Sequence, residues 1–152
     1  MRIAAPFGAM VAAMSSVPDE VFANNVVGHG VALIPPVGAD TIEVCAPVSG
    51  TVTAVFPHAF SIDVGDSRNV LVHLGIDTVE LRGDGFDLRI AQGDEVTVGQ
   101  VLISWDMRVA AQSGYALHCP VIAVQVEQDA LDVVAQPGTE VVAGQTLAVW
   151  LR

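Results

Sequence analysis

The sequence predicts an all-β fold, an antiparallel β-sandwich or barrel with a few short helices. Three observations support this prediction. Valine is spread along the whole chain, and valine favours strands. Fourteen glycines and eight prolines supply the turns that many short strands need. Segments with a helical pattern are scarce. We expect one domain, residues 1–152, whose core is mostly aliphatic because 52% of residues are hydrophobic and only 5% are aromatic.

Nine segments have the composition and the flanking turn residues of strands. They span residues 8–13, 31–34, 42–45, 50–55, 59–64, 67–74, 100–105, 120–125 and 146–151. Short helical segments are expected at 106–112 and 127–135, and one helical turn around 18–24. The segment 127–135 opens with acidic residues and is followed by Pro137-Gly138, as helices often are.

The N-terminal segment resembles a secretory signal, because Arg2 precedes the apolar residues 3–14. Pro6 and Gly8 interrupt this stretch, so we assign it to the fold instead. No stretch reaches the roughly 18–20 apolar residues that a membrane-spanning helix needs. We therefore expect a soluble, cytoplasmic protein that does not insert into a membrane.

Two sequence echoes predict an approximate internal duplication. QGDEVTVGQVLISW at residues 92–105 matches PGTEVVAGQTLAVW at residues 137–150 at seven of fourteen positions. A weaker echo relates Ala5-Pro6 to Ala46-Pro47, and each of these pairs precedes a strand rich in Val and Ala. We expect a sheet structure with an approximate internal duplication rather than an array of repeats.

The charge composition excludes several classes of function. All six basic residues are Arg, they face 17 acidic residues, and the formal net charge is −11. Without lysine the chain has no Walker-type phosphate loop, no Schiff-base nucleophile and no attachment site for lipoyl or biotin. Nucleic-acid binding is not expected, since no basic patch can neutralise phosphates. A strongly acidic protein suits basic protein partners.

The two cysteines, Cys45 and Cys119, do not form a disulfide framework, and we expect free thiols. His118-Cys119 lacks a second, suitably spaced ligand pair, so we do not expect a zinc site there.

Two histidines are expected to meet in a β-hairpin. Gly65-Asp66 suits a two-residue type II′ turn, which would place His58 directly opposite His73, with Cα atoms roughly 5 Å apart. His58, Phe60, Leu71 and His73 would then share one face. This register depends on the turn, because a turn centred on Ser67 would separate the two histidines. His29, between Gly28 and Gly30, is expected in a polar turn.

Two neighbouring imidazoles resist double protonation, so at least one is neutral near pH 7. A neutral ring nitrogen can attack phosphorus while the neighbouring ring steadies the transferred group. The pair can also provide two ligands for zinc, although a stable site needs three or four. Packing and hydrogen bonding on a strand face is the purely structural alternative.

The segment HLGIDTVELRGDGF, from His73 to Phe86, resembles the signature of the glucose-type IIA component of the bacterial sugar phosphotransferase system. Residues 46–50 and 58–60 resemble the preceding motifs of that family, residues 17–22 and 28–30 its N-terminal segment, and residues 93–100, 119–120 and 144–147 its later strands. The resemblance covers nearly the whole chain from about Ala5.

The resemblance implies that His73 accepts a phosphoryl group from the phosphorylated carrier protein HPr and passes it to a cysteine of the IIB domain of a membrane sugar permease. His58 would support the transfer. No cofactor is implied, although a zinc ion shared with a partner at His58 and His73 remains an alternative. The implied partner-binding residues are Asp19, Phe22, Val26, Phe60, Leu71, Asp77 and Val79.

Two other classes of function share features with this sequence. The same face can serve a regulatory module that binds transporters or metabolic enzymes. The Gly-Asp-Glu-Val and Ala-Pro-x-x-Gly segments are shared with biotinyl and lipoyl domains, but the absence of lysine excludes that prosthetic chemistry. The chain also departs from the family at three places: His29 replaces a common acidic residue, Phe56-Pro57 replaces a polar pair, and Leu71 replaces a common aromatic residue.

Overall fold

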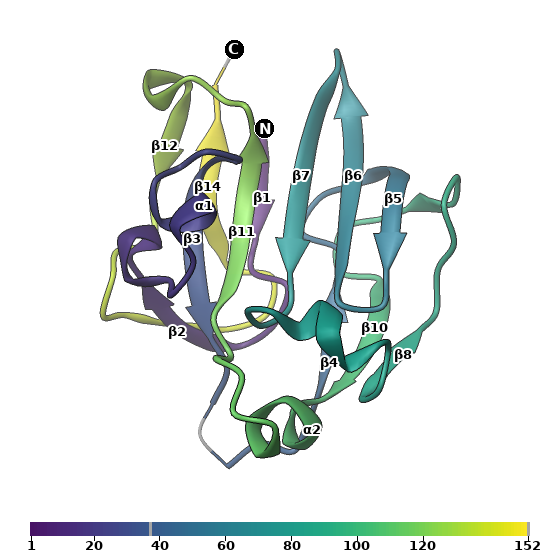
Figure 1. Ribbon diagram of the computed structural model, residues 1–152. Helices are drawn as coiled ribbons and strands as arrows, with labels where there is room; N and C mark the ends of the chain where they lie inside the picture. Colours follow the sequence, from purple (N-terminus) through teal and green to yellow (C-terminus); the bar gives the residue numbers. More distant parts are fainter. Residues whose placement is uncertain (37, 152) are drawn as a thin grey trace.

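The computed structural model describes residues 1–36 and 38–151, and this part of the chain is mostly antiparallel β-sheet with short helices (Figure 1). The strands are β1 (Arg2–Ala4), β2 (Ala9–Ala12), β3 (Gly28–Ile34), β4 (Thr41–Cys45), β5 (Gly50–Phe56), β6 (Ala59–Gly65), β7 (Arg68–His73), β8 (Phe86–Leu88), β9 (Glu95–Val96), β10 (Val101–Asp106), β11 (Cys119–Val124), β12 (Leu131–Val133), β13 (Glu140–Val141) and β14 (Thr146–Trp150). The helices are α1 (Glu20–Ala23) and α2 (Met107–Gln112), with 3-10 turns η1 (Met14–Ser16), η2 (Thr78–Leu81) and η3 (Gln128–Ala130). The predicted all-β class is confirmed.

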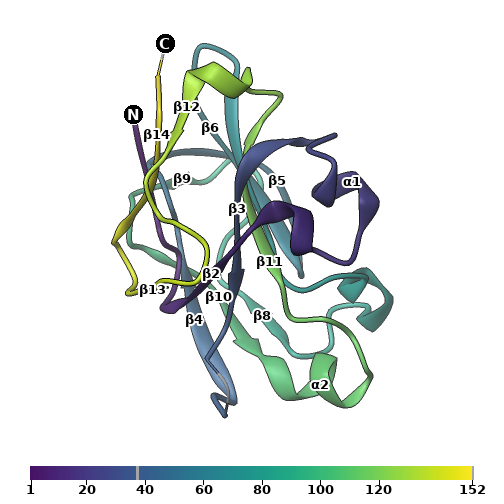
Figure 2. The same ribbon diagram turned by 90° about the vertical axis from the view of Figure 1, so that its left-hand side faces the viewer.

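The strands form one large sheet and two small ones. The large sheet has the order β13-β2-β3-β11-β7-β6-β5-β9, and the small sheets have the orders β1-β14-β12 and β4-β10-β8. Strands β7 and β11 pair in the middle of the large sheet, and the two sets of strands spread to either side of them (Figure 1). Seen from the side, the sheets curl around a common interior (Figure 2).

The structure confirms the predicted duplication at the level of backbone hydrogen bonds. The amide of Ala4 donates to the Pro47 carbonyl, and reciprocally the amide of Cys45 donates to the Pro6 carbonyl, each at 2.9 Å. These four residues lie in or beside the two Ala-Pro segments. Such reciprocity is expected when two similar segments face each other across an approximate two-fold axis.

The other sequence echo occupies corresponding places in the two halves. Strand β9 pairs with β5, and β13 pairs with β2. The strand at the end of each repeat pairs with the first strand of its own half, so β10 lies beside β4 and β14 lies beside β1. The repeated Trp105 and Trp150 lie near or at the ends of these strands. Trp105 pairs with Phe86 of β8, and Trp150 pairs with Leu131 of β12.

Two hydrophobic clusters lie on the two faces of the central strands. The larger cluster fills the interior between the sheets and contains Phe60, Ile62, Val70 and Val72, all fully buried. The smaller cluster lies outside the large sheet beneath η1 and α1 and contains Met14, Val17, Phe22, Ala32, Ile76 and Ile122. Alternation along β7 sends Val70 and Val72 to the interior, so Leu71 and His73 face the smaller cluster and the solvent beyond it.

All nine predicted strands are present, with ends that differ by a few residues, and α1 and α2 lie where helical segments were expected. The prediction of a helix over 127–135 is wrong beyond the short turn η3. Leu131 to Val133 pair with β14 as strand β12, because Leu131 alternates into the core and tertiary pairing outweighs the local helix signals. Five strands of two or three residues, β1, β8, β9, β12 and β13, were not predicted. No helix in the described part of the chain is both long and apolar enough to cross a membrane.

Candidate functional site: a histidine pair at the end of a hairpin

The hairpin that carries the histidines has a different register from the predicted one. Ala59, not His58, pairs with His73. The turn residues Asp66 and Ser67 both have positive φ, 55° and 60°, as in a type I′ turn. The Asp63 carboxylate accepts a hydrogen bond from the Gly65 amide at 2.8 Å, and this local turn accompanies an irregularity in the ladder between Asp63 and Gly65. The reversal is therefore centred one residue later than predicted.

The change of register separates Phe60 from the histidines. Phe60 pairs with Val72 and is fully buried in the interior. Leu71 and His73 lie on the opposite face of the sheet. The prediction that His58, Phe60, Leu71 and His73 share one face is therefore wrong for Phe60, because a shift of one residue moves a side chain to the other side of the sheet.

The two imidazoles nevertheless meet. His58 lies just before β6, where the side chain no longer follows the alternation of the strand, and its carbonyl accepts a hydrogen bond from the Leu74 amide at 2.7 Å. The rings of His58 and His73 have centroids 5.0 Å apart and are inclined by 77°. The predicted proximity is correct, and it arises at the open end of the hairpin rather than from direct cross-strand pairing.

A hydrogen bond to the backbone fixes the orientation and the tautomer of His73. Its Nδ1 lies 2.6 Å from the Gly75 carbonyl oxygen. A carbonyl oxygen only accepts hydrogen bonds, so Nδ1 carries the proton and donates it. In the neutral ring Nε2 then keeps its lone pair. Phe22 packs against the same imidazole with ring centroids 5.0 Å apart, which restricts its rotation.

The turn after β7 holds this carbonyl in place. Gly75 has φ 77°, and a Cβ there would lie 2.6 Å from the Thr78 methyl group. The Thr78 hydroxyl donates to the Leu74 carbonyl at 2.6 Å and is fully buried. The Ile76 amide donates to the Ala116 carbonyl at 3.0 Å. Because glycine alone adopts this conformation at no cost, Gly75 allows the chain to turn back towards His73.

Cys119 lies beneath this turn. Burial raises the pKa of its thiol to about 12, and a hydrogen bond with the Gly75 backbone opposes part of the shift. The thiol is therefore protonated at neutral pH, and it donates to the Leu117 carbonyl at 3.2 Å. Cys45 is free too, and both cysteines are unpaired as predicted.

Both histidines resist protonation. Burial, and then the neighbouring His73, lower the pKa of His58 to about 4. Burial also lowers the pKa of His73, while the Gly75 carbonyl and the carboxylates of Asp19 and Asp77 act in the opposite direction. Both rings are consequently neutral near pH 7, which is the state required of a nucleophile or a metal ligand.

Exposed apolar side chains lie on segments near the two histidines: α1 and the residues after it, η2, and the end of β5. Val26 and Val79, both predicted to contact partners, are 61% and 57% exposed. The structure adds Val21 and Phe56 to this surface, at 48% and 57% exposed, and the Phe56 ring lies 6.0 Å from that of His58. We call these four residues the apolar rim. Of the other predicted contacts, Phe22 is buried against His73 and Leu71 is half-buried.

The acidic residues predicted to contact partners take different places. Asp19 caps α1 by accepting a hydrogen bond from the Val21 amide at 2.9 Å. Asp77 is exposed in the left-handed conformation at the start of η2. The carboxylates of both lie close enough to His73 to affect its pKa. The site thus combines an apolar rim with negative charge.

The described residues include no group of three or more side chains able to hold a metal ion. His58 and His73 provide two neutral nitrogen ligands, so zinc would need further ligands from another molecule.

The prediction of a turn at His29 is wrong, because His29 lies within β3 and pairs with Ala123. A Cβ on Gly30 would overlap the Val121 carbonyl oxygen, so this glycine permits the close approach of β11 rather than a turn.

Comparisons with known proteins agree with this geometry. A family described as "phosphoenolpyruvate-dependent sugar phosphotransferase system, EIIA 1" matches residues 1–129. The chain is 36% identical over 124 residues to the PTS system glucose-specific EIIA component of Oceanobacillus iheyensis, covering 80% of this chain and 73% of the relative. It is 37% identical over 123 residues to the PTS system beta-glucoside-specific EIIBCA component of Halalkalibacterium halodurans, covering 80% of this chain. The chain spans only 19% of the length of that larger relative.

The fold has a close counterpart among solved structures. The glucose permease IIA from Mycoplasma capricolum superimposes with a TM-score of 0.87 at 31% identity, covering 97% of this chain and 94% of that one. An M23 metalloprotease, pseudoalterin, superimposes with a TM-score of 0.54 at 14% identity, which is a likeness of fold alone.

Proposed function

The chain belongs to the EIIA 1 family of the phosphoenolpyruvate-dependent sugar phosphotransferase system, and from that premise we propose that it carries a phosphoryl group on Nε2 of His73. The observation that carries the proposal is the hydrogen bond from Nδ1 of His73 to the Gly75 carbonyl. It assigns the proton to one ring nitrogen and the lone pair to the other. A fixed, neutral imidazole with a free lone pair is the form that attacks phosphorus.

The first transfer exchanges one nitrogen–phosphorus bond for another. Nε2 of His73 attacks the phosphoryl group of phosphorylated HPr, and the N–P bond of the donor breaks as the new one forms. The Nδ1 proton stays in the hydrogen bond to Gly75, which stabilises the positive charge that the ring gains. In the second transfer a cysteine thiolate of a IIB domain attacks phosphorus, the S–P bond forms, and His73 leaves as a neutral imidazole.

His58 assists the onward transfer. Its ring lies 5.0 Å from that of His73, so an N–H of His58 can reach an oxygen of a phosphoryl group held on Nε2. The low pKa of His58 keeps this ring uncharged at pH 7, and it therefore contributes a hydrogen bond rather than a full charge. A neutral donor stabilises the group in flight without holding it too tightly to leave.

The apolar rim and the nearby carboxylates indicate what kind of partner docks. A complementary surface would be apolar at its centre and basic at its edge. The carrier HPr and the IIB domain would use this surface in turn, since both need access to the same nitrogen. The EIIBCA relative has A, B and C components in one chain, which supports a IIB partner.

A regulatory use of the same face is the second candidate. Two neutral imidazoles side by side offer two zinc ligands, and a carboxylate from a bound protein can complete the site. Phosphorylation of Nε2 would remove one ligand and release such a partner. A partner whose affinity is the same for the phosphorylated and unphosphorylated chain would instead indicate a scaffold.

The decisive experiment follows radioactive phosphate from phosphorylated HPr to the chain. We expect one phosphate per chain, stable in alkali and labile in acid, at His73 as mapped by mass spectrometry. His73→Gln should abolish labelling. If this variant accepts phosphate at the normal rate, the proposed mechanism is wrong. Onward transfer to a panel of IIB domains for glucose, N-acetylglucosamine and β-glucosides then identifies the sugar system.

A further inference from the structure

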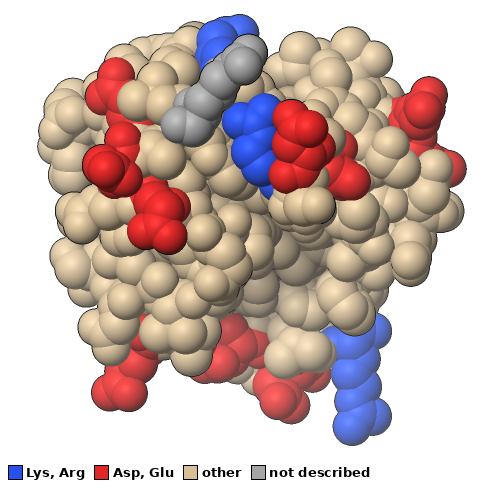
Figure 3. Space-filling model, turned by 90° about the horizontal axis from the view of Figure 1, so that it is seen from above, with Lys and Arg blue, Asp and Glu red and all other residues tan. Residues whose placement is uncertain are grey.

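A cavity of about 700 Å³ lies at the opposite end of β7 from the histidine pair. Arg68 is the first residue of that strand and lines the cavity, whereas His73 is the last residue. The other walls come from the turn before β7, the segment after β11 and the end of β14. Seen from above, this face of the molecule has a central hollow with basic and acidic atoms side by side at its edge (Figure 3).

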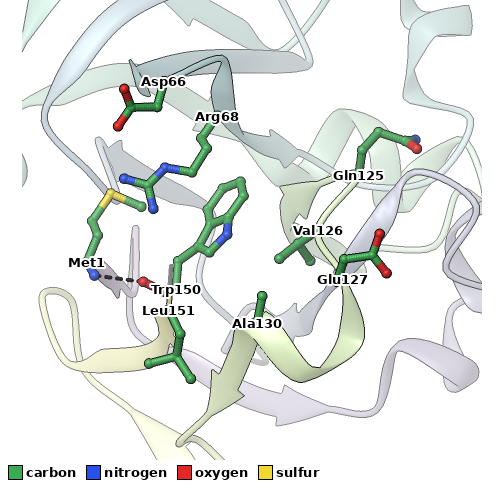
Figure 4. A pocket seen from close by; sticks show the side chains of 9 residues that line it. All are labelled: Met1, Asp66, Arg68, Gln125, Val126, Glu127, Ala130, Trp150 and Leu151. Carbon is green, nitrogen blue, oxygen red and sulfur yellow. Dashed lines mark hydrogen bonds between the residues drawn. The ribbon is translucent and has the colours of Figure 1, made fainter.

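Arg68 is the main polar feature of the cavity. Its guanidinium carbon lies 5.3 Å from the centroid of the Trp150 ring, and its Nε is buried without a hydrogen-bond partner. Asp66 and Met1 lie on the other side of the guanidinium (Figure 4). Among residues 1–36 and 38–151, none forms an ion pair with Arg68, unlike Arg89 and Arg108. A partly buried cation that has no ion-pair partner among these residues is unfavourable, and an incoming anion would relieve that cost.

The duplicated framework shows what a filled version of this end looks like. Trp105 is the counterpart of Trp150, and Phe86 stacks on it at 5.7 Å with an interplanar angle of 11°. Helix α2 follows directly and buries Met107 and Ala110, so Trp105 is fully buried. At the other end Leu131 takes the place of Phe86 in the pairing, and Arg68 covers the tryptophan instead of a second ring. A cavity remains at the Trp150 end.

We propose that this cavity binds a small organic monoanion with an apolar body. The forked guanidinium of Arg68 matches the geometry of a carboxylate. Val126, Ala130 and Leu151 offer an apolar wall, and the Leu151 side chain is 46% exposed. The volume is in the range of sites for small molecules. Asp66 and Glu127 line the same cavity, and their negative charge disfavours polyanions such as nucleotides and sugar phosphates.

The test uses 3-phenylpropionate as the probe and the nitrogen-15-labelled full chain as the receptor. The two tryptophan indole N–H signals serve as reporter and internal reference. We expect a saturable shift of the Trp150 signal and none of the Trp105 signal. Inorganic phosphate and the neutral 3-phenylpropanol should leave Trp150 unchanged at the same concentrations. The readout involves no phosphoryl transfer, so it is independent of the role of His73.

Two variants distinguish specific binding in the cavity from non-specific binding to the surface. Arg68→Met keeps an aliphatic cover over Trp150 but removes the charge, and it should raise the Kd for the probe about tenfold or more. Arg89→Met removes an exposed arginine paired with Glu43 at 3.4 Å and should leave the Kd unchanged. Thermal unfolding of both variants verifies the fold. Equal binding to the Arg68 variant, equal binding of the neutral alcohol, or a shift that does not saturate would each overturn the proposal.

Discussion

The two halves of the molecule have the same strand framework, but only one half carries a histidine pair. The pairing across three neighbouring strands shows the correspondence. In one half Leu33 pairs with Val11 on one side and Cys119 on the other. In the other half Ile62 pairs in the same way with Val52 and Val70. The same correspondence places His29 where His58 lies, and Ile122 where His73 lies. His29 faces Ala123, as His58 faces Leu74.

The difference lies in where a strand ends. Strand β11 continues to Val124, and Ile122 is fully buried in the smaller hydrophobic cluster. Strand β7 ends at His73, and the chain then turns at Gly75 so that a carbonyl faces back towards the imidazole. The histidine pair therefore depends on the end of a strand and the turn that follows. The duplicated sheet supplies only the support.

The largest effect is expected from removing the second ring of the pair. His58→Gln should still accept phosphate on His73, because the nucleophile and its hydrogen bond to Gly75 remain. Onward transfer to the IIB domain should fall about a hundredfold, as when one donor to a transferring group is lost. Single-turnover transfer from the isolated phosphorylated variant measures this step. A normal rate would show that His58 only packs against His73.

A change at the turn should affect both stability and transfer. In Gly75→Ala the new Cβ would sit at positive φ and 2.6 Å from the Thr78 methyl group, costing about 1–3 kcal/mol in free energy of unfolding. Phosphate acceptance should slow as well, because the displaced carbonyl no longer orients His73. Gly99→Ala is the matched control: φ there is 89° and nothing lies within 4 Å of the added Cβ. Equal effects on transfer in the two variants would contradict the positioning role of Gly75.

Near neutral pH, a change of pH should affect the transfer rate less than either of these substitutions. Phosphate acceptance requires neutral His73, whose pKa is lowered, so the rate should be flat near pH 7 and fall on acidification below the ordinary histidine value of 6.5. NMR titration should give His58 a pKa of about 4, rising in His73→Gln because the charge of His73 is removed.

The same pKa shifts make the free energy of unfolding depend on pH. Between pH 6.5 and 4 the unfolded chain binds more protons at these histidines than the folded chain, so the free energy of unfolding should decrease as pH falls. A His58 pKa near 6.5 in the folded protein would contradict this assignment.

No effect on labelling or onward transfer is expected from His29→Gln. His29 occupies the position in its half that His58 occupies in the other. The residue that corresponds to His73 there is Ile122, which is not a histidine. Labelling and transfer rates within experimental error of the unaltered chain would support the comparison. A loss as large as that of His58→Gln would show that the second half takes part in the chemistry.

The sequence was sufficient to predict the long elements and the proximity of His58 and His73. Strands rich in Val, bounded by Gly and Pro, could be located because burial of one or both faces dictates their composition. The duplication was visible because the turn residues of the repeat are constrained by backbone conformation. Strands of two or three residues, such as β9 and β13, carry too few side chains to signal their pairing.

The register of the hairpin could not be read from the turn residues alone. Gly65 suggested a type II′ turn, but the Asp63 carboxylate binds the Gly65 amide and shifts the reversal to Asp66-Ser67. This shift decides that Phe60 is an interior residue. The contact between Gly75 and His73 was also missed, although a glycine two residues after a candidate histidine is a local signal of a turn that can provide a backbone acceptor.

The pairing of β1 with β14 has a consequence for how the chain folds. Arg2 lies opposite Val149, and Ile3 lies opposite Ala148, so the first strand finds its partner only when almost all of the 152 residues are available. Many other pairings, such as β3 with β11, also join residues distant in sequence. Chains dominated by such contacts fold slowly, in milliseconds to seconds, and expose unpaired strands meanwhile. During synthesis, the N-terminal strand must therefore wait for the last β-strand to emerge before the small sheet can close.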